Sequence, residues 1–586
     1  MKNIGFLLAW LLPGLFPLFG SDDVAALEDI WPRYPTQEQE VKKRNPLVGS
    51  INAIVIVGRP DRMVSDSELL VTQGIVIKGV DIPGKESHFI DQLKPYLGRP
   101  LDMDTIGEIK DTINAYFRSQ GHPLILVQVP EQDVTSGVLQ IMALESRLGQ
   151  VFVQDNQYFS SEKLAKMIRV KPGEYIDEGV LVRNLNLINR NPFRHANILY
   201  APGLEEGTTD LILSVEDRRP LRLYTGYENT GVHATGHNRF YAGLNWGNVF
   251  GLGDIFAYQY TASDNFSTFQ AHTAQYIAPF SWGHVLNLMA GYSSVDVVLD
   301  EFLVGQDDGT LQTQQMRNNG FALQGSLRYI MPLYLTRYLL NDLIIGFDFK
   351  RTNNTVIFGL DIAPDFGKNV NLTQLVLGYA GDYDRTNFRL DFETNLYWSP
   401  GKWISDQTDA DYESLVPKAK NKWLYWRSAF AYLQRLPKSF SYFLKLEGQL
   451  STANLLPSED LSLGGWDTVR GYEQSVVNKE NVILASTEFR SPPLPIISKG
   501  GRRPADGFQV LAFLDYGYAR NQFAYPKVGN KTVDPQSLWL MGIGPGFRYT
   551  IDPYFAARVD WGFKLHKDRY IGTRPYFVHF NVTASY

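Results

Sequence analysis

The C-terminal end of the chain alternates apolar and polar residues with a period of two, over segments long enough to cross a membrane as strands. In residues 555–566 the apolar side chains share one face of an extended chain, and Arg558, Asp560 and Lys564 lie on the other face. Residues 576–586 repeat the pattern. Strands of about ten residues with one apolar and one charged face are typical of a membrane barrel, with lipid outside and water inside. A closed barrel is also the one sheet that satisfies its backbone hydrogen bonds in lipid. The pattern therefore predicts a transmembrane β-barrel.

The distribution of aromatic residues indicates where this barrel begins. Of the 11 Trp, 32 Tyr and 34 Phe, 16 lie in residues 1–219 and 61 lie in residues 220–586. Of the 50 glycines, 17 lie in residues 1–219 and 33 lie in residues 220–586. Aromatic side chains gather at the two interfaces between a membrane and water. We therefore expect the barrel to span residues 220–586.

The alternation predicts sixteen antiparallel strands, an even number as bacterial barrels require. Short links such as 281–283 and 436–438 alternate mostly with longer links such as 297–319 and 452–480. The exception is the link 491–507, which is long although it falls where the short links are expected. Short periplasmic turns and long outer loops are the usual asymmetry. The expected strands cover residues 221–229, 239–246, 254–263, 267–280, 284–296, 320–331, 341–352, 373–384, 386–398, 422–435, 439–451, 481–490, 508–519, 537–550, 554–566 and 576–586.

Residues 74–219 show the order strand, helix, helix, strand, strand twice. In the first unit, residues 74–147, the helix 104–120 has apolar residues at helical spacing, with Asp104 as the expected N-cap and Gly121 as the stop. The second unit, residues 148–219, repeats this order. Two units of one design form a tandem repeat. The free edge of such a sheet can accept an extended peptide as a further strand, although the units could also be spacers.

The first twenty residues have Lys2 followed by a compact apolar run, which predicts a secretory signal peptide in residues 1–20. The alternative is a buried N-terminal helix. Residues 21–73 form an N-terminal linker region to which we assign no role, although residues 51–57 could be a strand.

One long link carries the residues that point to a function. Link 452–480 contains Val469, Arg470, Gly471 and Tyr472. In strand 508–519 the side chains of Phe513, Asp515 and Gly517 share the face that should line the lumen. The link could fold back into the barrel so that Arg470 pairs with Asp515 through charge-assisted hydrogen bonds. The alternative is an exposed loop with an unrelated arginine.

Three glycines could receive such a loop. Gly542, Gly544 and Gly546 share one face of strand 537–550. Glycines in a strand often mark a place where another backbone approaches closely. We therefore expect a lumenal glycine groove.

The VRGY segment at 469–472 and the FLDYG segment at 513–517 together resemble the signature of the POTRA-barrel superfamily of outer-membrane transporters and assembly factors. Within it, the chain resembles the two-partner secretion transporters of the ShlB/FhaC/HecB type. The first unit carries residues that resemble this group's POTRA motif, with His122 where Tyr or Phe is more usual; they are Gly121, Pro130, Gln132 and Gly137. Tyr586 stands where the family's barrel-assembly signal ends in an aromatic residue.

The resemblance implies an outer-membrane pore with periplasmic POTRA domains that captures an unfolded exoprotein and secretes it without nucleotide hydrolysis. It implies partners of the β-helical adhesin or haemolysin kind, together with outer-membrane lipid and the barrel-assembly machinery. The family often has an N-terminal helix that plugs the barrel, but residues 21–73 show no convincing amphipathic helix. A barrel-assembly factor is the main alternative, although such factors usually carry three or more POTRA domains.

Other chemistry has little support in the sequence. The chain has no cysteine, so thiolate metal sites and disulfides are excluded. It has no GxxxxGK[ST], GxSxG or HExxH motif. The net charge of −6 argues against nucleic-acid binding. We therefore expect no enzymatic activity, no cofactor and no metal.

Overall fold

The computed structural model describes residues 49–59, 62–65, 68, 71–205, 207–305, 311–333, 339–353, 369–498, 505–525, 535–568 and 570–586. The expected signal peptide and most of the linker region lie outside the described residues. The chain divides into one compact unit of residues Val24–Arg218 and another that contains Arg219–Tyr586. In the described parts no helix is both long and apolar enough to cross a membrane.

The first sheet has the order β2-β1-β4-β3. Its strands are β1 (Ala53–Val57), β2 (Gly74–Lys78), β3 (Ile125–Gln128) and β4 (Val138–Glu145), accompanied by α3 (Glu86–Leu93), the single turn η3 (Lys94–Tyr96) and α4 (Met103–Ser119). The N-cap of helix α4 lies two residues earlier than expected, because the side chain of Asp102, not Asp104, accepts a hydrogen bond of 2.7 Å from the Thr105 amide. Its apolar stripe is buried in the core of this unit.

Strand β1 changes the expected start of this unit at residue 74. It lies between β2 and β4, parallel to both, and all five of its residues are fully buried. The sequence shows a short apolar run here because a strand covered on both faces needs no alternation. Its partners lie about twenty and eighty-five positions away in the chain, so the local sequence pattern does not show that this segment belongs to the unit.

The second sheet has the order β5-β7-β6. It consists of β5 (Arg147–Gln154), β6 (Arg194–Pro202) and β7 (Thr208–Asp217), with helices α5 (Ser161–Met167) and α6 (Glu178–Ile188) between β5 and β6. The side chains of Ser160 and Asp177 cap the two helices. The element order is the one that the sequence predicts.

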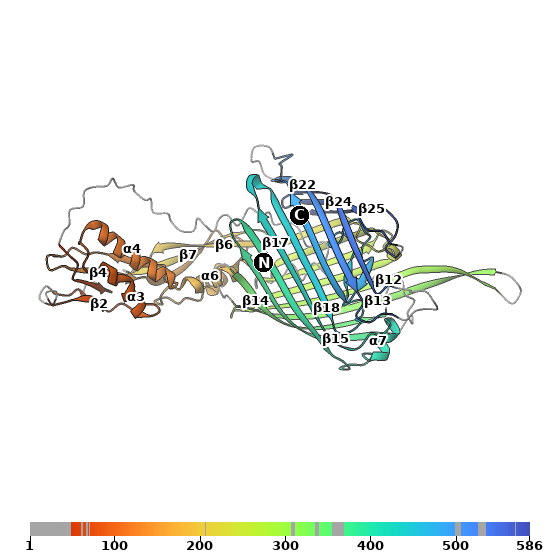
Figure 1. Ribbon diagram of the computed structural model, residues 1–586, viewed down its shortest axis with the longest axis horizontal. Helices are drawn as coiled ribbons and strands as arrows, with labels where there is room; N and C mark the ends of the chain where they lie inside the picture. Colours follow the sequence, from red (N-terminus) through yellow and green to blue (C-terminus); the bar gives the residue numbers. More distant parts are fainter. Residues whose placement is uncertain are drawn as a thin grey trace. The chain divides into compact units, whose positions relative to one another are not determined.

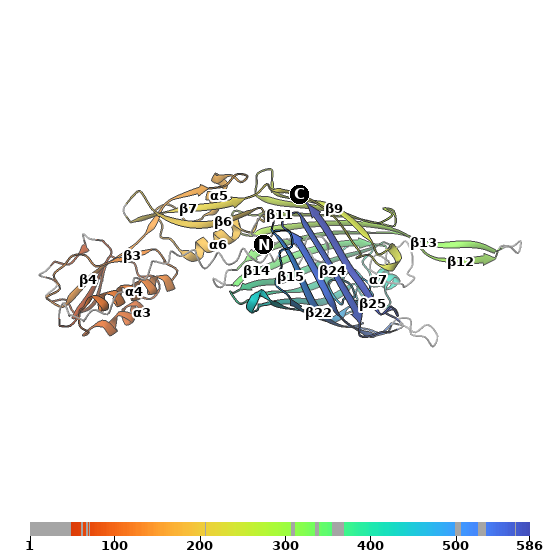
Figure 2. The same ribbon diagram turned by 90° about the horizontal axis from the view of Figure 1, so that it is seen from above.

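Beyond residue 219 the chain forms a closed barrel of sixteen strands, which confirms the expected fold class (Figures 1 and 2). Each strand is antiparallel to its neighbours, and β25 pairs with β8 to close the sheet. The strands are β8 (Leu221–Glu228), β9 (Arg239–Val249), β10 (Asp254–Ser263), β11 (Phe269–Pro279), β12 (Val285–Gly305), β13 (Leu311–Pro332), β14 (Leu339–Thr352), β15 (Val370–Asp384), β16 (Phe388–Pro400), β17 (Lys422–Arg435), β18 (Ser441–Ser451), β21 (Asn481–Arg490), β22 (Asp506–Arg520), β23 (Ser537–Ile551), β24 (Phe555–Lys564) and β25 (Tyr576–Ser585).

Burial alternates along the strands as a lipid-facing wall requires. In β22 the side chains of Leu514 and Tyr516 are 38% and 40% exposed, whereas Phe513 and Asp515 are 3% and 0% exposed. The exposed apolar face is the one that lipid covers, and the buried face lines the lumen.

Two links differ from the loops that the sequence predicts. Strands β12 and β13 remain paired as far as Gly305 and Leu311, so most of the expected loop 297–319 is a two-stranded ribbon. The link 401–421 contains a short helix, α7 (Asp409–Leu415). Residues 452–480, named the inner loop below, contain a small hairpin of β19 (Leu461–Leu463) and β20 (Val477–Lys479).

Candidate functional site

The inner loop folds back into the barrel and packs on the lumenal wall. Its apolar side chains and those of the wall form one buried cluster. Leu463, Val469 and Tyr472 are each fully buried. Burial of this apolar surface holds the loop in the lumen, so the alternative of an exposed loop does not describe this structure. The cluster consists of Leu461, Leu463, Val469, Tyr472, Val477, Val482, Leu484, Ala519, Leu540 and Ile571.

Arg470, in the middle of this loop, binds Asp515 of β22 through three hydrogen bonds. Its Nε and Nη2 donate to the two carboxylate oxygens of Asp515 at 2.7 and 2.8 Å, and its backbone amide donates to Oδ2 at 3.0 Å. The guanidinium is 3% exposed and the carboxylate 0% exposed. A bidentate pair of this kind fixes orientation as well as position.

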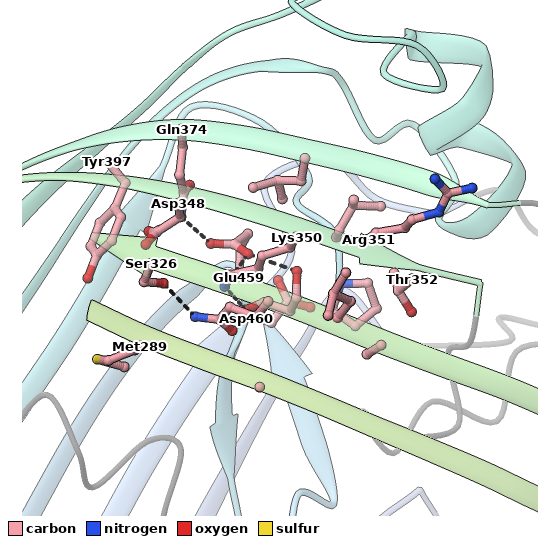
Figure 3. Close-up of a pocket in the computed structure, with 18 of the residues that line it drawn as sticks. Met289, Ser326, Asp348, Lys350, Arg351, Thr352, Gln374, Tyr397, Glu459 and Asp460 are labelled. Carbon is pink, nitrogen blue, oxygen red and sulfur yellow. Dashed lines mark hydrogen bonds and ion pairs between the residues drawn. The ribbon is translucent and has the colours of Figure 1, made fainter. Parts of the chain in front are cut away.

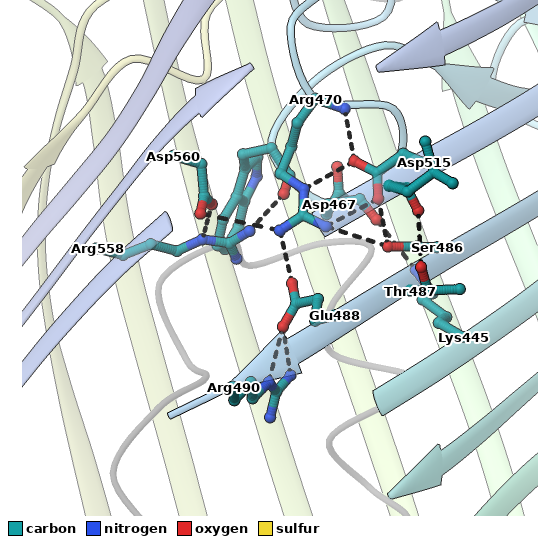
Figure 4. A network of polar contacts seen from close by, with 12 residues as sticks. Lys445, Asp467, Arg470, Ser486, Thr487, Glu488, Arg490, Asp515, Arg558 and Asp560 are labelled. Atoms are coloured by element: carbon teal, nitrogen blue, oxygen red, sulfur yellow. Dashed lines mark hydrogen bonds and ion pairs between the residues drawn. The ribbon is translucent and has the colours of Figure 1, made fainter. Parts of the chain in front are cut away.

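The remaining edges of the Arg470 guanidinium are also satisfied (Figure 4). Nη1 donates to Glu488 at 2.5 Å, Nη2 donates to Ser486 at 3.2 Å, and the aromatic ring of Phe513 lies 3.7 Å from the guanidinium carbon. Ser486 itself donates to Asp515 at 2.5 Å. Cation and ring therefore stack while the acidic groups hold the rim of the guanidinium.

Further charges extend the network on the lumenal wall. Glu488 also pairs with Arg490 at 2.7 Å. Asp560 of β24 lies 3.8 Å from Arg470 and accepts hydrogen bonds from Arg548 at 2.8 Å and Arg558 at 2.6 Å. Arg558 in turn donates to the carbonyl of Trp466 in the inner loop at 2.6 Å. Charges of alternating sign thus connect the loop to four strands of the wall.

The glycines show where the loop approaches the wall most closely. A Cβ added at Gly542 would lie 1.9 Å from the carbonyl oxygen of Arg470, and one at Gly562 would lie 2.2 Å from the amide nitrogen of Gly471. A Cβ at Gly517 would lie 2.8 Å from Leu463 of the loop. At Gly542 and Gly562 only glycine leaves room for the loop backbone, and at Gly517 glycine leaves room for the side chain of Leu463.

The expected glycine groove is shorter than the sequence suggests. For Gly544 the nearest atoms to an added Cβ belong to Trp561 and Phe513, and for Gly546 they belong to Asp560 and Leu511. The loop crosses β23 at Gly542 and continues onto β24 at Gly562, so it does not run along β23. Gly544 instead makes room for the backbone of Trp561 on the neighbouring strand, and Gly546 makes room for the side chains of Asp560 and Leu511.

The motif residues on both sides of Arg470 also bind the wall. The side chain of Val469 packs on Gly517, where an added Cβ would lie 3.0 Å from it. The amide of Gly471 donates to Nε2 of His579 at 3.4 Å. The hydroxyl of Tyr472 donates to the carbonyl of His566 at 2.7 Å and accepts from the amide of Met541 at 3.2 Å.

In the first α/β unit the motif residues shape the turns before and after β3. Gln132 pairs with the backbone of Gln140, donating to its carbonyl at 2.7 Å and accepting from its amide at 2.7 Å, and it also donates to the carbonyl of Pro130 at 3.1 Å. Gly121 and Gly137 both adopt positive φ, at 88° and 75°. These residues therefore hold the turns on either side of β3.

Two further positions complete the set of expected residues. Tyr586 is 80% exposed and exchanges two backbone hydrogen bonds with Leu223, of 3.0 and 2.8 Å, where the barrel closes. His122, at the aromatic position of the POTRA motif, hydrogen-bonds to Glu145, and burial raises the pKa of Glu145.

Several partners of Arg470 cannot be identified from the sequence alone. Ser486, Glu488, Gly562 and His579 contact Arg470 or Gly471, and Asp560 lies just beyond. The signal was present, because each lies on the polar face of its alternating strand. Alternation indicates a lumenal side chain but not which lumenal side chains meet.

A cavity of about 440 Å³, lined by many charged and polar side chains, lies beside the first part of the inner loop, residues 456–462 (Figure 3). Glu459 in this part binds Lys350 of β14 at 2.6 Å and accepts hydrogen bonds from Gln374 at 2.8 Å and Tyr425 at 2.9 Å. Among the described residues no group of three His, Asp or Glu side chains could hold a metal ion. Polar contacts with the wall therefore hold this part of the inner loop inside the lumen.

Two α/β units followed by a sixteen-stranded barrel that holds such a loop define the class of POTRA-barrel proteins of the outer membrane. The family of haemolysin secretion/activation proteins ShlB/FhaC/HecB matches residues 207–330 and 338–549, which is more than half of the chain, and the chain belongs to this family. A POTRA domain of the ShlB type matches residues 70–146. The protein is thus a two-partner secretion transporter of the outer membrane, with its POTRA domains in the periplasm.

Individual relatives agree with this assignment. The heme/hemopexin transporter protein HuxB of Haemophilus influenzae is 24% identical over 487 residues, which is 80% of this chain and 78% of HuxB. The outer membrane transporter CdiB of Dickeya dadantii is 25% identical over 389 residues, 65% of each chain. The structure of CdiB from Escherichia coli superposes with a TM-score of 0.73 at 18% identity, covering 96% of this chain and 95% of that one, which shows a shared fold.

Proposed function

We propose that this transporter captures one unfolded exoprotein in the periplasm and passes it through the barrel lumen, under the control of the inner loop. The fastening of Arg470 to Asp515 inside the lumen is the observation that carries this proposal. A loop that occupies the lumen beside a polar cavity must be repositioned before a chain can pass. The buried pair provides a defined resting position for it.

The α/β units supply edges for capture. Strands β2 and β3 are the outer strands of the first sheet, and β5 and β6 are those of the second. An extended segment of an unfolded exoprotein can add to such an edge through main-chain hydrogen bonds. Main-chain recognition suits a partner that arrives unfolded and is rich in strand-forming sequence, such as a β-helical adhesin or haemolysin. The relative HuxB is named for transport of heme/hemopexin, so the exoproteins of this family differ in their own activities.

The energy for transport would come from folding of the exoprotein outside the cell. The sequence contains no phosphate-binding loop of the GxxxxGK[ST] type. A chain that folds as it emerges cannot slide back, so its folding free energy pulls the remainder outward.

Two further partners follow from the wall of the barrel. Outer-membrane lipid would cover the exposed apolar face, which includes Leu514, Tyr516 and Trp561. The barrel-assembly machinery would recognise the last strand, β25, and the exposed aromatic ring of Tyr586.

The substitution Arg470→Ala tests the role of the inner loop. It leaves Asp515 and Glu488 buried without their cation, and removing one partner of a buried pair costs about 3–5 kcal/mol. The barrel has its own ladder of hydrogen bonds and should still insert. We expect secretion to fall roughly tenfold or more, measured as exoprotein in the culture medium against heat-modifiable barrel in the outer membrane.

Arg328→Ala is the matched control. Arg328 forms an equally buried bidentate pair with Asp348, at 2.7 and 3.0 Å, on the lumenal wall. Its contacts are with wall strands β13 and β14, so its loss should affect secretion much less. Normal secretion by Arg470→Ala would refute the proposed role of the loop.

Deletion of the whole protein separates transport from barrel assembly. A transporter of this family should leave the other outer-membrane barrels intact, while one secreted protein disappears from the culture medium. A general loss of outer-membrane barrels would instead support the assembly function.

A further inference from the structure

The outer loop 401–421, which links β16 and β17, folds into the mouth of the barrel. Strand β8 starts at Leu221, close behind β7, so its first residue lies on the periplasmic side. Strands alternate in direction, and β16 is the ninth of the barrel, so this loop lies at the extracellular end. The inner loop, after β18, and the link 521–536, after β22, begin at the same end by the same count.

An apolar cluster seats the outer loop on the lumenal side of the wall. Tyr412 and Ala419 of this loop are 0% exposed. They belong to a cluster with wall residues such as Trp423, whose side chain has the lumenal parity of its strand. The cluster consists of Val370, Leu372, Tyr412, Leu415, Val416, Ala419, Trp423, Tyr425, Ala453, Leu455 and Leu456. One face of the loop is therefore packed on the lumenal side of the wall at the mouth, and the loop is named the stopper below.

One flank of this stopper is bound firmly to the wall. The hydroxyl of Tyr412 donates to the carbonyl of Asn371 at 2.8 Å. The amide and side chain of Asn371 donate to the carbonyls of Asp406 and Ser405, each at 2.9 Å. The outer loop thus extends the sheet at the start of β15, beyond the point where β16 stops pairing with it.

The other flank is held by two side chains. Lys418 of the outer loop donates to the carbonyl of Ala524 in link 521–536 at 2.7 Å, and the second side chain is that of Asn454 at the start of the inner loop. Its Nδ2 donates to the carbonyl of Pro417 in the outer loop at 3.1 Å and to that of Phe523 in link 521–536 at 3.0 Å. Its Oδ1 accepts from the amide of Phe523 at 2.7 Å. Asn454 is 0% exposed, and its backbone forms a parallel bridge with Ala419. One amide side chain therefore ties three loops together.

The stopper adjoins the lumenal cavity. Four residues belong both to the apolar cluster and to the lining of the cavity: Val370, Leu372, Tyr425 and Leu456. Tyr397 also lines the cavity and packs against the cluster. In Figure 3 helix α7 lies at the end of the cavity where β14 and β15 reach their outer ends. No residue of the outer loop lines this cavity, but the cavity ends against the apolar cluster that holds the loop. A polypeptide that leaves the lumen on this side must therefore pass the outer loop.

We propose that the outer loop 401–421 is an exit gate, closed in this structure by the Asn454 fastening and opened when that fastening is released. This inference rests on the proposed function. The gate turns about its firm flank at Asn371, because the Asn454 flank has few hydrogen bonds to break. Since Asn454 belongs to the inner loop, repositioning of that loop withdraws Asn454 and frees the gate at the same time. The two movements are thereby coupled through one residue.

The pair Ala419→Cys/Asn454→Cys tests the gate in the full chain. These residues are bridge partners, so their Cβ atoms are close enough for a disulfide, and the chain has no other cysteine. The probe is ion flow in potassium chloride through the purified protein in a planar lipid bilayer. We expect the oxidised pair to conduct no more than the unsubstituted protein. We expect reduction to raise conductance severalfold, because the disulfide is broken and the Asn454 amide is gone.

A matched cysteine pair controls for oxidation itself. Ala262→Cys/Gln270→Cys joins register partners of the β10–β11 hairpin at the same end of the barrel. These strands are already neighbours, so oxidation should leave conductance unchanged. Equal conductance of the oxidised and reduced Ala419→Cys/Asn454→Cys protein would overturn the gate.

A second variant tests the gate in case the Ala419→Cys/Asn454→Cys protein does not fold. Asn454→Ala should raise conductance without any oxidant, whereas Asn265→Ala, in the tight β10–β11 turn at the same end, should not. Unchanged conductance of an inserted Asn454→Ala protein also overturns the proposal.

Secretion distinguishes failure of the gate from failure of the transport function. The reduced cysteine pair should release the exoprotein and the oxidised pair should block it. Equal release in both states refutes the gate but leaves transport intact, and a block in both states also refutes it. If no secreted protein depends on the unsubstituted chain, the proposed function fails, and the conductance measurement still decides the gate.

Discussion

Arg470 fixes the position of the inner loop more than it stabilises the fold of the barrel. Three arginines and three acidic groups alternate around Arg470 on the wall: Arg490, Arg548, Arg558, Glu488, Asp515 and Asp560. Buried ion pairs lose about as much in desolvation as they gain from attraction. A displaced loop, however, would leave several of these charges without partners. The network therefore penalises every position of the inner loop except the observed one.

Gly542→Ala is expected to displace the loop without removing any charge. The new Cβ would lie 1.9 Å from the carbonyl oxygen of Arg470, which is backbone and cannot rotate away. We expect less secretion and faster cleavage of the inner loop by added protease, at unchanged barrel insertion.

Gly291→Ala is the control for this substitution. An added Cβ there would meet its nearest atom, a methyl carbon of Thr273, at 4.0 Å, which is ordinary contact. Equal protease resistance of the Gly542→Ala and Gly291→Ala proteins would contradict the close approach.

At this scale the sequence indicated part of the site. The alternation in β22 placed Asp515 in the lumen, and the resemblance linked it to Arg470. Glu488 and His579 are separated from the motif by 18 and 108 positions, and only the curvature of the barrel brings them to it.

Among the elements, the first α/β unit contains a strand that the sequence suggested but could not place. Strand β1 is held by β2 and β4 on its two sides. A side-chain ladder continues across the sheet, because Gln132 pairs with the backbone of Gln140 and the side chain of Gln140 pairs with the backbone of Val64. The ladder ties the segment after β1 to the POTRA motif.

Gln140→Leu is expected to loosen this segment. The amide and carbonyl of Val64, which is 7% exposed, would lose bonds of 2.8 and 3.2 Å. Leaving buried polar groups without partners costs about 1–3 kcal/mol. Hydrogen exchange of the amides near Val64 and in β1 should therefore accelerate in the full chain.

Gln128→Leu, on the exposed face of β3, provides the comparison. It should leave the exchange of these amides unchanged. If hydrogen exchange near Val64 accelerated equally in both variants, the hydrogen bonds of Gln140 would have no specific role in holding this segment.

The whole barrel is closed by its shortest seam. Strands β25 and β8 share five register positions, whereas β22 and β23 share fifteen. The two backbone bonds between Tyr586 and Leu223 extend the seam by one residue pair. The free energy of local opening rises with the number of bonds that must break together.

Hydrogen exchange should therefore be fastest at this seam. We expect the amides of residues 224–228 and 581–585 to exchange sooner than those of residues 510–518 when the protein is measured in lipid. Exchange at the same rate in the two regions would show that closure is as cooperative as the rest of the wall.

The sequence by itself determined the class of architecture: two α/β units, sixteen strands and the face of each strand that meets lipid. Periodicity is a local property, and lipid on one side and water on the other impose it on every strand separately. Only the tertiary structure decided that the inner loop crosses at Gly542 and Gly562, that β1 joins the first sheet and that Asn454 ties three loops together. Those contacts join residues far apart in the chain, and their free energy depends on the closed barrel, which no single segment encodes.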